Sequence, residues 1–168
     1  MAIASTKQMK ISSSVEAVAL FAEVRECLTS GSKSLHARID FMEGQIFSKL
    51  GVKEFLDRPN YLSLQINQSQ HIMLEPEWLQ YINHSCNPNI FFDTARKEAI
   101  VLKPIEVGEE ITFFYPSTEW SMNRAFDCFC NSEHCLGKIQ GSKFLSPNIL
   151  ADYKLSNHIR RSISSHLV

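Results

Sequence analysis

Three cysteines fall within a short polar stretch near the C-terminal end of the chain, in the order Cys128, Cys130 and Cys135. Thiolates this close together can surround one soft ion, and Zn²⁺ takes four ligands in a closed structural site. The stretch supplies three ligands, so the fourth must come from elsewhere. The candidates are the other two cysteines and two histidines: Cys27, Cys86, His84 and His134. A metal held by four thiolates would be structural, because no position stays open for water.

Ordinary buried thiols and a disulfide are the alternatives to a metal site. The chain has five cysteines, an odd number, and no recognisable export signal. Reduced thiols or a metal site are therefore favoured over disulfides. Cys27 follows a strand-like run and is expected to be an ordinary buried thiol.

Two further segments carry side chains capable of chemistry. Residues 83–89 read Asn-His-Ser-Cys-Asn-Pro-Asn, a run of turn-forming residues that can aim the Cys86 side chain outward. Residues 108–115 read Gly-Glu-Glu-Ile-Thr-Phe-Phe-Tyr, a turn followed by a strand-like run that ends on Tyr115. These two segments and the cysteine stretch are the places where we look for a functional site.

Short runs rich in Val, Ile, Phe and Tyr must position these side chains. Turn residues separate the runs, which predicts many short strands and a mainly β fold. The expected strands are Val18–Arg25, Leu35–Phe41, Tyr61–Asn67, His71–Leu74, Ile90–Phe92, Ala99–Lys103 and Ile111–Tyr115. Helices are expected at Val52–Leu56, Glu77–Ile82 and, at the end of the chain, Pro147–Ile163.

Length and composition are those of an ordinary globular domain. The chain has 168 residues, of which 44% are hydrophobic and 21% charged, so an intrinsically disordered chain is excluded. The formal net charge is −1, which gives no overall basic excess for binding nucleic acid or an anionic membrane. The longest apolar run, Ala17–Ala22, is six residues, far short of the roughly 20 that a membrane-spanning helix needs.

Together, residues 83–89, residues 108–115 and the Cys128–Cys135 stretch resemble the SET-domain protein lysine methyltransferases that carry a post-SET zinc lobe. The resemblance implies small curved β-sheets, with the first two segments crossing in a pseudoknot, and S-adenosylmethionine (AdoMet) as methyl donor. It divides the chain into a polar leader (1–14), a SET core (15–118), a post-SET zinc lobe (119–142) and a helical C-terminal tail (143–168).

The resemblance also assigns residues by position. Tyr115 would be the catalytic tyrosine, and Phe113 and Tyr61 would stand beside it in the channel that receives the lysine. The zinc ligands would be Cys86, Cys128, Cys130 and Cys135. The AdoMet site would comprise residues from four segments: Lys33, Ser34, Leu35, Asn83, His84, Tyr115 and Leu136.

Two departures from the family pattern bear on function. Members usually have a Gly-x-Gly turn against the donor, where this chain has Ser32 and Ser34. Glycine permits a positive φ and close backbone approach, so the serines are expected to affect AdoMet affinity rather than the fold. Many members carry Asp before the catalytic tyrosine, where this chain has Phe114.

The resemblance implies methyl transfer to the ε-amine of lysine in an extended segment of a protein substrate, histones being one possibility. No direct nucleic-acid contact and no membrane association are expected. The expected location is intracellular, in the cytoplasm or the nucleus according to the source organism. The main alternative is a zinc-containing SET-like binding or scaffold module without catalysis. A zinc-binding nucleic-acid module is disfavoured because the chain has balanced charge and no basic stripe.

Overall fold

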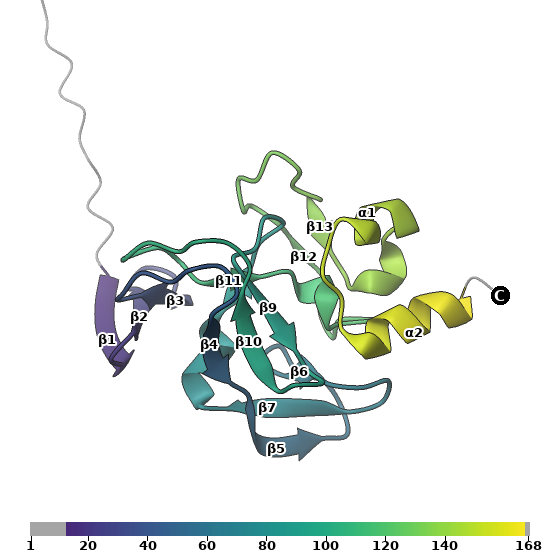
Figure 1. Cartoon of the computed structure of the whole chain (residues 1–168), viewed down its shortest axis with the longest axis horizontal. Coiled ribbons are helices and arrows are strands. Elements are labelled where there is room, and N and C mark those ends of the chain that lie inside the picture. Colours follow the sequence, from purple (N-terminus) through teal and green to yellow (C-terminus); the bar gives the residue numbers. More distant parts are fainter. Residues whose placement is uncertain (1–12, 167–168) are drawn as a thin grey trace, which may run out of the picture.

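The computed structural model describes residues 13–166 and shows four small β-sheets followed by a helical C-terminal segment (Figure 1). The prediction of a mainly β fold is confirmed. Most of the predicted leader, residues 1–12, lies outside the described residues, and Ser13 and Ser14 begin the first strand.

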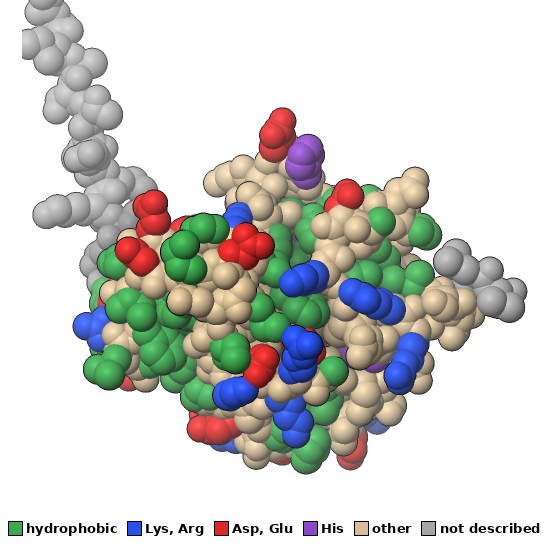
Figure 2. All heavy atoms as spheres, in the orientation of Figure 1, with side chains coloured by type: hydrophobic (Ala, Val, Ile, Leu, Met, Phe, Trp, Pro, Cys, Tyr) green, Lys and Arg blue, Asp and Glu red, His purple; other side chains and the backbone are tan. Residues whose placement is uncertain are grey.

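The first sheet is an antiparallel meander of β1 (Ser13–Ala19), β2 (Ala22–Cys27) and β3 (Lys33–Ala37). Its inner face contributes Ala22, Val24, Leu35 and Ala37 to the main core. Hydrophobic side chains also show on the surface in this region, to the left in Figure 2, whereas Lys and Arg gather over the middle of the same face with acidic residues among them.

Two sheets form the centre of the molecule. One has the order β4 (Ile46–Lys49), β10 (Glu98–Val101), β9 (Ile90–Asp93), β11 (Thr112–Phe113) and β8 (Asn83–His84). The other has the order β5 (Gly51–Leu56), β7 (His71–Glu75) and β6 (Leu64–Gln65). The 3₁₀ helix η1 (Glu77–Tyr81) leads from β7 toward β8. The main core includes buried side chains from both sheets and η1, among them Phe92, Leu74 and Leu79.

The segment after β11 forms the remaining elements. They are η2 (Tyr115–Ser117), a small antiparallel pair of β12 (Phe126–Asp127) and β13 (Lys138–Ile139), η3 (Ser142–Phe144), α1 (Pro147–Ala151) and α2 (Asn157–His166). In Figure 1 the helices lie on the opposite side of the central strands from β1–β3.

The two signature segments interlock as expected for a pseudoknot. Strand β11 lies between β8 and β9 and runs parallel to both, although residues 85–89 connect β8 directly to β9. The buried side chain of Asn89 fastens the crossing: its Nδ2 donates to the Glu110 carbonyl (2.8 Å) and its Oδ1 accepts from the Thr112 amide (2.8 Å). The backbone amide of Ser85 donates to the Phe113 carbonyl (3.1 Å). This crossing brings His84 and Cys86 next to Tyr115.

Several element predictions were wrong in whole or in part. The expected strand Tyr61–Asn67 is reduced to β6 (Leu64–Gln65). Val52–Leu56 belongs to β5, because pairing with β7 overrides the weak local preference for a helix. The expected strand Val18–Arg25 is divided between β1 and β2 by a tight turn at Leu20 and Phe21, which are not typical turn residues. The expected terminal helix Pro147–Ile163 is interrupted, with α1 ending at Ala151 and α2 beginning at Asn157.

The C-terminal segment explains why Phe114 replaces the aspartate of many family members. The Phe114 ring is buried and stacks on Tyr153, with centroids 3.7 Å apart and an interplanar angle of 8°. It shares a small core with Leu150, Leu155 and Ile159. The hydroxyl of Tyr153 donates to the Cys86 carbonyl (2.9 Å). An apolar side chain at position 114 therefore gives α1 and α2 a surface on which to pack beside the cysteine cluster.

We expect Tyr153→Ala to destabilise the protein more than Tyr153→Phe. Losing only the hydroxyl removes one hydrogen bond, worth about 1 kcal/mol, whereas losing the ring also removes the stacking partner of Phe114, for a total of about 3 kcal/mol. Urea denaturation of both variants measures the difference. Equal stabilities for Tyr153→Ala and the original protein would contradict a structural role for this contact.

Candidate functional site

The crossing and the C-terminal lobe bring the four predicted zinc ligands together. The sulfur atoms of Cys86, Cys128, Cys130 and Cys135 all lie within 4.8 Å of one another, and all four cysteines are free of disulfides. Cys86 comes from the loop between β8 and β9, and the other three lie between β12 and β13. Of the four candidates for the fourth ligand, Cys86 is the one that the structure groups with the other three cysteines, in a cluster that could hold a metal ion. Cys27 lies outside this cluster, and its side chain approaches Thr29 instead (3.1 Å). The expectation that Cys27 is a buried thiol was wrong, because it lies at the end of β2 and is only partly buried.

The surroundings of the cluster suit a thiolate-bound metal. The Leu136 amide donates to Cys86 Sγ (3.4 Å), and the Cys86 amide donates to Cys130 Sγ (3.5 Å). Burial raises the pKa of the Cys86 thiol to about 11 in the metal-free chain, so a bound dication would be needed to hold this sulfur as a thiolate at neutral pH. The donor set fits Zn²⁺, which prefers four sulfur ligands in a closed site.

His84 connects the cysteine cluster to the aromatic site. Its Nδ1 accepts from the Tyr115 amide (3.2 Å), and its Nε2 lies 3.3 Å from Cys86 Sγ. Because Nδ1 is an acceptor, the neutral ring carries its proton on Nε2, where it can donate to the sulfur. Burial lowers the pKa of His84 to about 4, which keeps the ring neutral at physiological pH.

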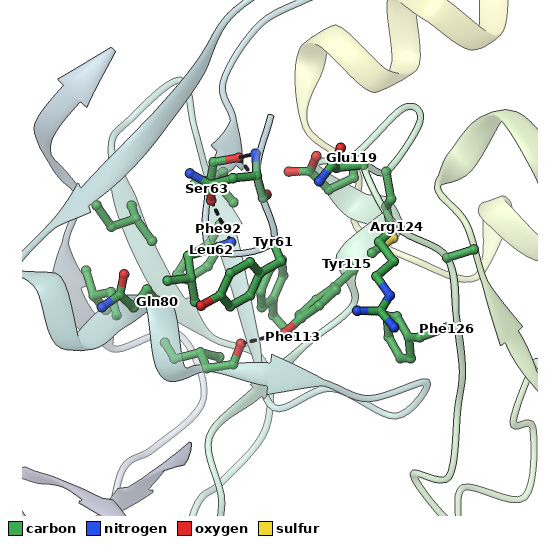
Figure 3. A pocket seen from close by; sticks show the side chains of 18 of the residues that line it. Tyr61, Leu62, Ser63, Gln80, Phe92, Phe113, Tyr115, Glu119, Arg124 and Phe126 are labelled. Atoms are coloured by element: carbon green, nitrogen blue, oxygen red, sulfur yellow. Dashed lines mark hydrogen bonds between the residues drawn. The ribbon is translucent and has the colours of Figure 1, made fainter. Parts of the chain in front are cut away.

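A pocket of 580 Å³ contains the three residues predicted for the channel, Tyr61, Phe113 and Tyr115 (Figure 3). The Phe113 and Tyr115 ring centroids are 4.6 Å apart. Tyr61 lies at the rim with 81% of its side chain exposed. Apolar residues such as Leu64 and Phe92 line the interior, so a group that enters exchanges water for an apolar environment.

The Tyr115 hydroxyl donates to the Ile82 carbonyl (3.2 Å), and Ile82 also lines the pocket. Burial raises the pKa of Tyr115, and the carboxylates of Glu110 and Glu119 raise it further. The hydroxyl therefore stays protonated at neutral pH and can act as a hydrogen-bond donor or acceptor, but not as a phenolate.

The residues predicted for the AdoMet site form a connected set. Asn83 Nδ2 donates to the Lys33 carbonyl (3.1 Å) and to Glu110 Oε1 (2.9 Å). These contacts join β3, which also carries Ser34 and Leu35, to β8. His84 follows Asn83 on β8 and accepts a hydrogen bond from the Tyr115 amide. The Leu136 amide donates to Cys86 Sγ, which lies beside His84. Both Asn83 amide protons are used within the chain, so the Asn83 side-chain oxygen and the backbone groups around it are what could meet a polar cosubstrate such as AdoMet.

The two serines at the family's glycine positions adopt ordinary backbone conformations. Among the non-glycine residues described, only Lys97 and Asn131 have a positive φ, whereas Gly31, just before the first serine, has φ of 68°. Ser34 Oγ donates to the Arg25 carbonyl (3.4 Å) and lies 3.0 Å from His36 Nε2. The Ser34 side chain is thus held by contacts with Arg25 and His36 of its own sheet.

Sequence reasoning missed the roles of two residues, one in the pocket and one beside the cysteine cluster. Glu119 lines it and is 8% exposed; the available signal was an acid within an otherwise uncharged stretch, Tyr115–Met122. Tyr153, two residues after the end of α1, bonds to the Cys86 carbonyl, and no local sequence pattern indicates that contact. Phe126 lies against both His84 and Tyr115, with ring centroids 5.7 and 5.9 Å away.

Comparison with known proteins decides the family. The model of the SET domain matches residues 6–116. The chain belongs to the SET-domain family. The match covers both signature segments, residues 83–89 and 108–115, up to and including Tyr115.

Relatives of this SET domain are methyltransferases. Methyltransferase flvH of Aspergillus flavus is 40% identical over 134 residues, which are 79% of this chain and 73% of that protein. Histone-lysine N-methyltransferase Set2 of Drosophila melanogaster is 40% identical over 68 residues, 37% of this chain and 3% of that much longer protein. The methyltransferase domain of human PR domain-containing protein 2 has 18% identity and a TM-score of 0.44, covering 66% of this chain and 95% of its own.

No helix in residues 13–166 is long and apolar enough to cross a membrane.

Proposed function

We propose that this SET domain is an AdoMet-dependent protein-lysine methyltransferase with a structural zinc ion. The observation that carries the proposal is the placement of Tyr115: its side chain lines the pocket, and its backbone amide bonds to His84, which in turn lies beside Cys86 of the cysteine cluster. Membership of the SET-domain family and the methyltransferase relatives support it. The proposed divisions are a SET core at 15–118, a post-SET lobe at 119–142 and a C-terminal tail at 143–168.

AdoMet, when bound, supplies a methyl group on a positively charged sulfonium. Lys33, Ser34, Leu35, Asn83, His84 and Leu136 would hold it, with Tyr115 between donor and substrate. The acceptor amine must be neutral to attack, yet free lysine has a pKa of about 10.4. The apolar walls around Phe113 disfavour the ammonium form and so lower its pKa. Tyr115 then orients the amine through its hydroxyl, and the proton leaves to water.

The zinc ion would be held by Cys86, Cys128, Cys130 and Cys135, and would fix the lobe to the loop between β8 and β9.

The proposed substrate is a protein with an extended lysine-bearing segment. Histones are the first class to test, because several relatives are named as histone-lysine methyltransferases. An intracellular location, nuclear or cytoplasmic, belongs to the same proposal.

We expect the product to be di- or trimethyl-lysine. By the family resemblance, position 113 tunes product degree, and phenylalanine lacks the hydroxyl with which a tyrosine would restrain the amine. Phe113 lines the pocket and packs between Phe92 and Tyr115, with centroids 4.5 and 4.6 Å away, so position 113 borders the space proposed for the amine. Mass spectrometry after long incubation with core histones measures the products. Monomethyl-lysine as the sole product would contradict this expectation. Phe113→Tyr should shift the products toward monomethyl-lysine.

A further inference from the structure

The backbone that follows Tyr115 is fastened to the C-terminal segment of the chain. Tyr115 begins η2, and Figure 3 shows its side chain among the residues that line the pocket, with its hydroxyl bonded to the Ile82 carbonyl. The turn itself uses the Tyr115 carbonyl, which accepts from the amides of Thr118 (3.1 Å) and Glu119 (3.0 Å). The next four carbonyls, those of residues 116–119, all accept from residues of η3 or from residues 156–158.

Two buried serines hold three of these four carbonyls. The Ser142 amide donates to the Glu119 carbonyl (2.9 Å), and its hydroxyl lies within bonding distance of both the Glu119 and the Pro116 carbonyls. The amide and the hydroxyl of Ser156 both donate to the Ser117 carbonyl, each at 2.9 Å. Ser142 is 1% exposed and Ser156 is 3% exposed, so water does not compete for these bonds.

His158 of α2 holds the fourth carbonyl. Its Nε2 lies 2.7 Å from the Thr118 carbonyl, and because a carbonyl oxygen only accepts, Nε2 carries the proton and donates. The side chain is 5% exposed, and burial lowers its pKa, which favours the neutral ring. Nδ1 lies 3.2 Å from the Ser156 hydroxyl. The ring is therefore held in one orientation by Thr118 and Ser156.

A second set of bonds holds the same backbone from β6. The Gln65 amide donates to a carboxylate oxygen of Glu119 (2.7 Å), and Gln65 Oε1 accepts from the Trp120 amide (2.9 Å). The turn after Tyr115 is thus fixed between β6 and the C-terminal segment. Because the Tyr115 ring leaves the first residue of this turn, a change in the tilt of the turn moves the ring relative to the pocket.

We propose that His158 is a positioning residue for Tyr115, since its bond to the Thr118 carbonyl holds η2, and with it the Tyr115 ring, in place at the pocket. This inference rests on the proposed function and adds to it a residue 43 positions after Tyr115, outside the stretch 6–116 that matches the SET domain. His158 does not line the pocket, so it acts through the backbone of residues 115–118. A displacement of about 1 Å at a reacting group is enough to slow a reaction strongly.

The test compares two amide side chains at position 158 of the full, zinc-loaded chain. The nitrogen of glutamine can take the place of imidazole Nε2, whereas the nitrogen of asparagine, on a shorter side chain, takes the place of Nδ1. His158→Gln can therefore still donate to the Thr118 carbonyl, and His158→Asn cannot. Both variants bury a neutral amide, so the difference between them reports the bond to Thr118. His166→Asn is the control, because it makes the same exchange at the exposed end of α2.

The first readout does not require methyl transfer. Tyrosine labelled with ¹³C at Cζ gives one nuclear magnetic resonance signal for each of the four tyrosines, and Tyr115→Phe identifies the signal of Tyr115. We expect this signal to move in His158→Asn and to keep its position in His158→Gln and His166→Asn. A smaller folded fraction lowers the intensity of the signal without moving it. If His158→Asn does not fold, Ser156→Ala takes its place, because it removes the hydroxyl beside Nδ1 and keeps the Ser156 amide bond.

The second readout is turnover with core histones, expressed per AdoMet-binding site so that unfolded protein does not count. We expect His158→Asn to lower kcat about tenfold with little change in the KM for AdoMet, and His158→Gln to stay within about twofold of the original protein. An unmoved Tyr115 signal in His158→Asn, or equal kcat values for His158→Asn and His158→Gln, overturns the proposal. A moved signal together with no methyl transfer by the original protein would instead count against the proposed function alone.

Discussion

Tyr115→Phe is expected to lower methyl transfer by at least about 10²-fold, the cost typical of losing one preorganised hydrogen-bonding group at a reacting centre. The hydroxyl is buried in the pocket and bonded to the Ile82 carbonyl, so it is held in place before substrate arrives. The phenylalanine ring can keep its contacts with Phe113, His84 and Phe126. The loss should therefore fall on turnover, with only about 1 kcal/mol lost in stability.

The measurement is transfer of a labelled methyl group from AdoMet to core histones and, in parallel, to fractionated cell protein. Zinc content and thermal unfolding of Tyr115→Phe are determined on the same preparation, to show that the variant is folded. Tyr81→Phe serves as the matched control, because it removes a hydroxyl from η1 outside the 580 Å³ pocket. Near-normal turnover in Tyr115→Phe would remove the role assigned to this residue.

Loss of the zinc ion should abolish activity and unfold the C-terminal lobe together. Cys86 is the one proposed ligand that comes from the loop between β8 and β9, while the other three come from the C-terminal lobe. Cys86→Ser should therefore remove the metal link between this loop and the lobe. The free energy of metal binding at such a site is folding free energy, so we expect a loss of stability above about 3 kcal/mol. The loss should extend to the packing of Tyr153 against Phe114, because Tyr153 also bonds to the Cys86 carbonyl.

Metal analysis, circular dichroism and methyl transfer are measured for Cys86→Ser and for the original protein treated with a strong chelator. Cys27→Ser is the control, since Cys27 lies outside the cluster and should leave zinc content and activity unchanged. Persistent activity in protein shown to be metal-free would mean that the zinc site and the pocket are not coupled.

The sequence predicts the parts of this site that have fixed local spacing. The cysteine stretch and the segments at 83–89 and 108–115 could be recognised because their residue types are demanding and their order is fixed. Their convergence depends on β11 lying between β8 and β9, which the family resemblance implied and the structure shows. The sequence alone does not explain the phenylalanine at position 114, because its stacking partner Tyr153 lies 39 positions further along the chain.

Other features could not be read from local patterns. Strand β5 exists because β7 lies beside it, and the sequence does not reveal that pairing. The hairpin between β1 and β2 turns at Leu20 and Phe21 without Gly, Pro, Asn or Asp. Glu119 shows no special spacing, and only its burial, with its carboxylate facing His71, distinguishes it from a surface acid.

A calorimetric titration of AdoMet into zinc-loaded protein measures whether this SET domain binds the methyl donor. We expect binding at roughly micromolar concentration with one AdoMet per chain, because Asn83, Lys33 and Leu136 are already in place and Ser34 is held within its own sheet. Absence of binding in folded, zinc-loaded protein, also when core histones are added, would contradict it and would favour a SET domain that serves as a binding module without methyl transfer.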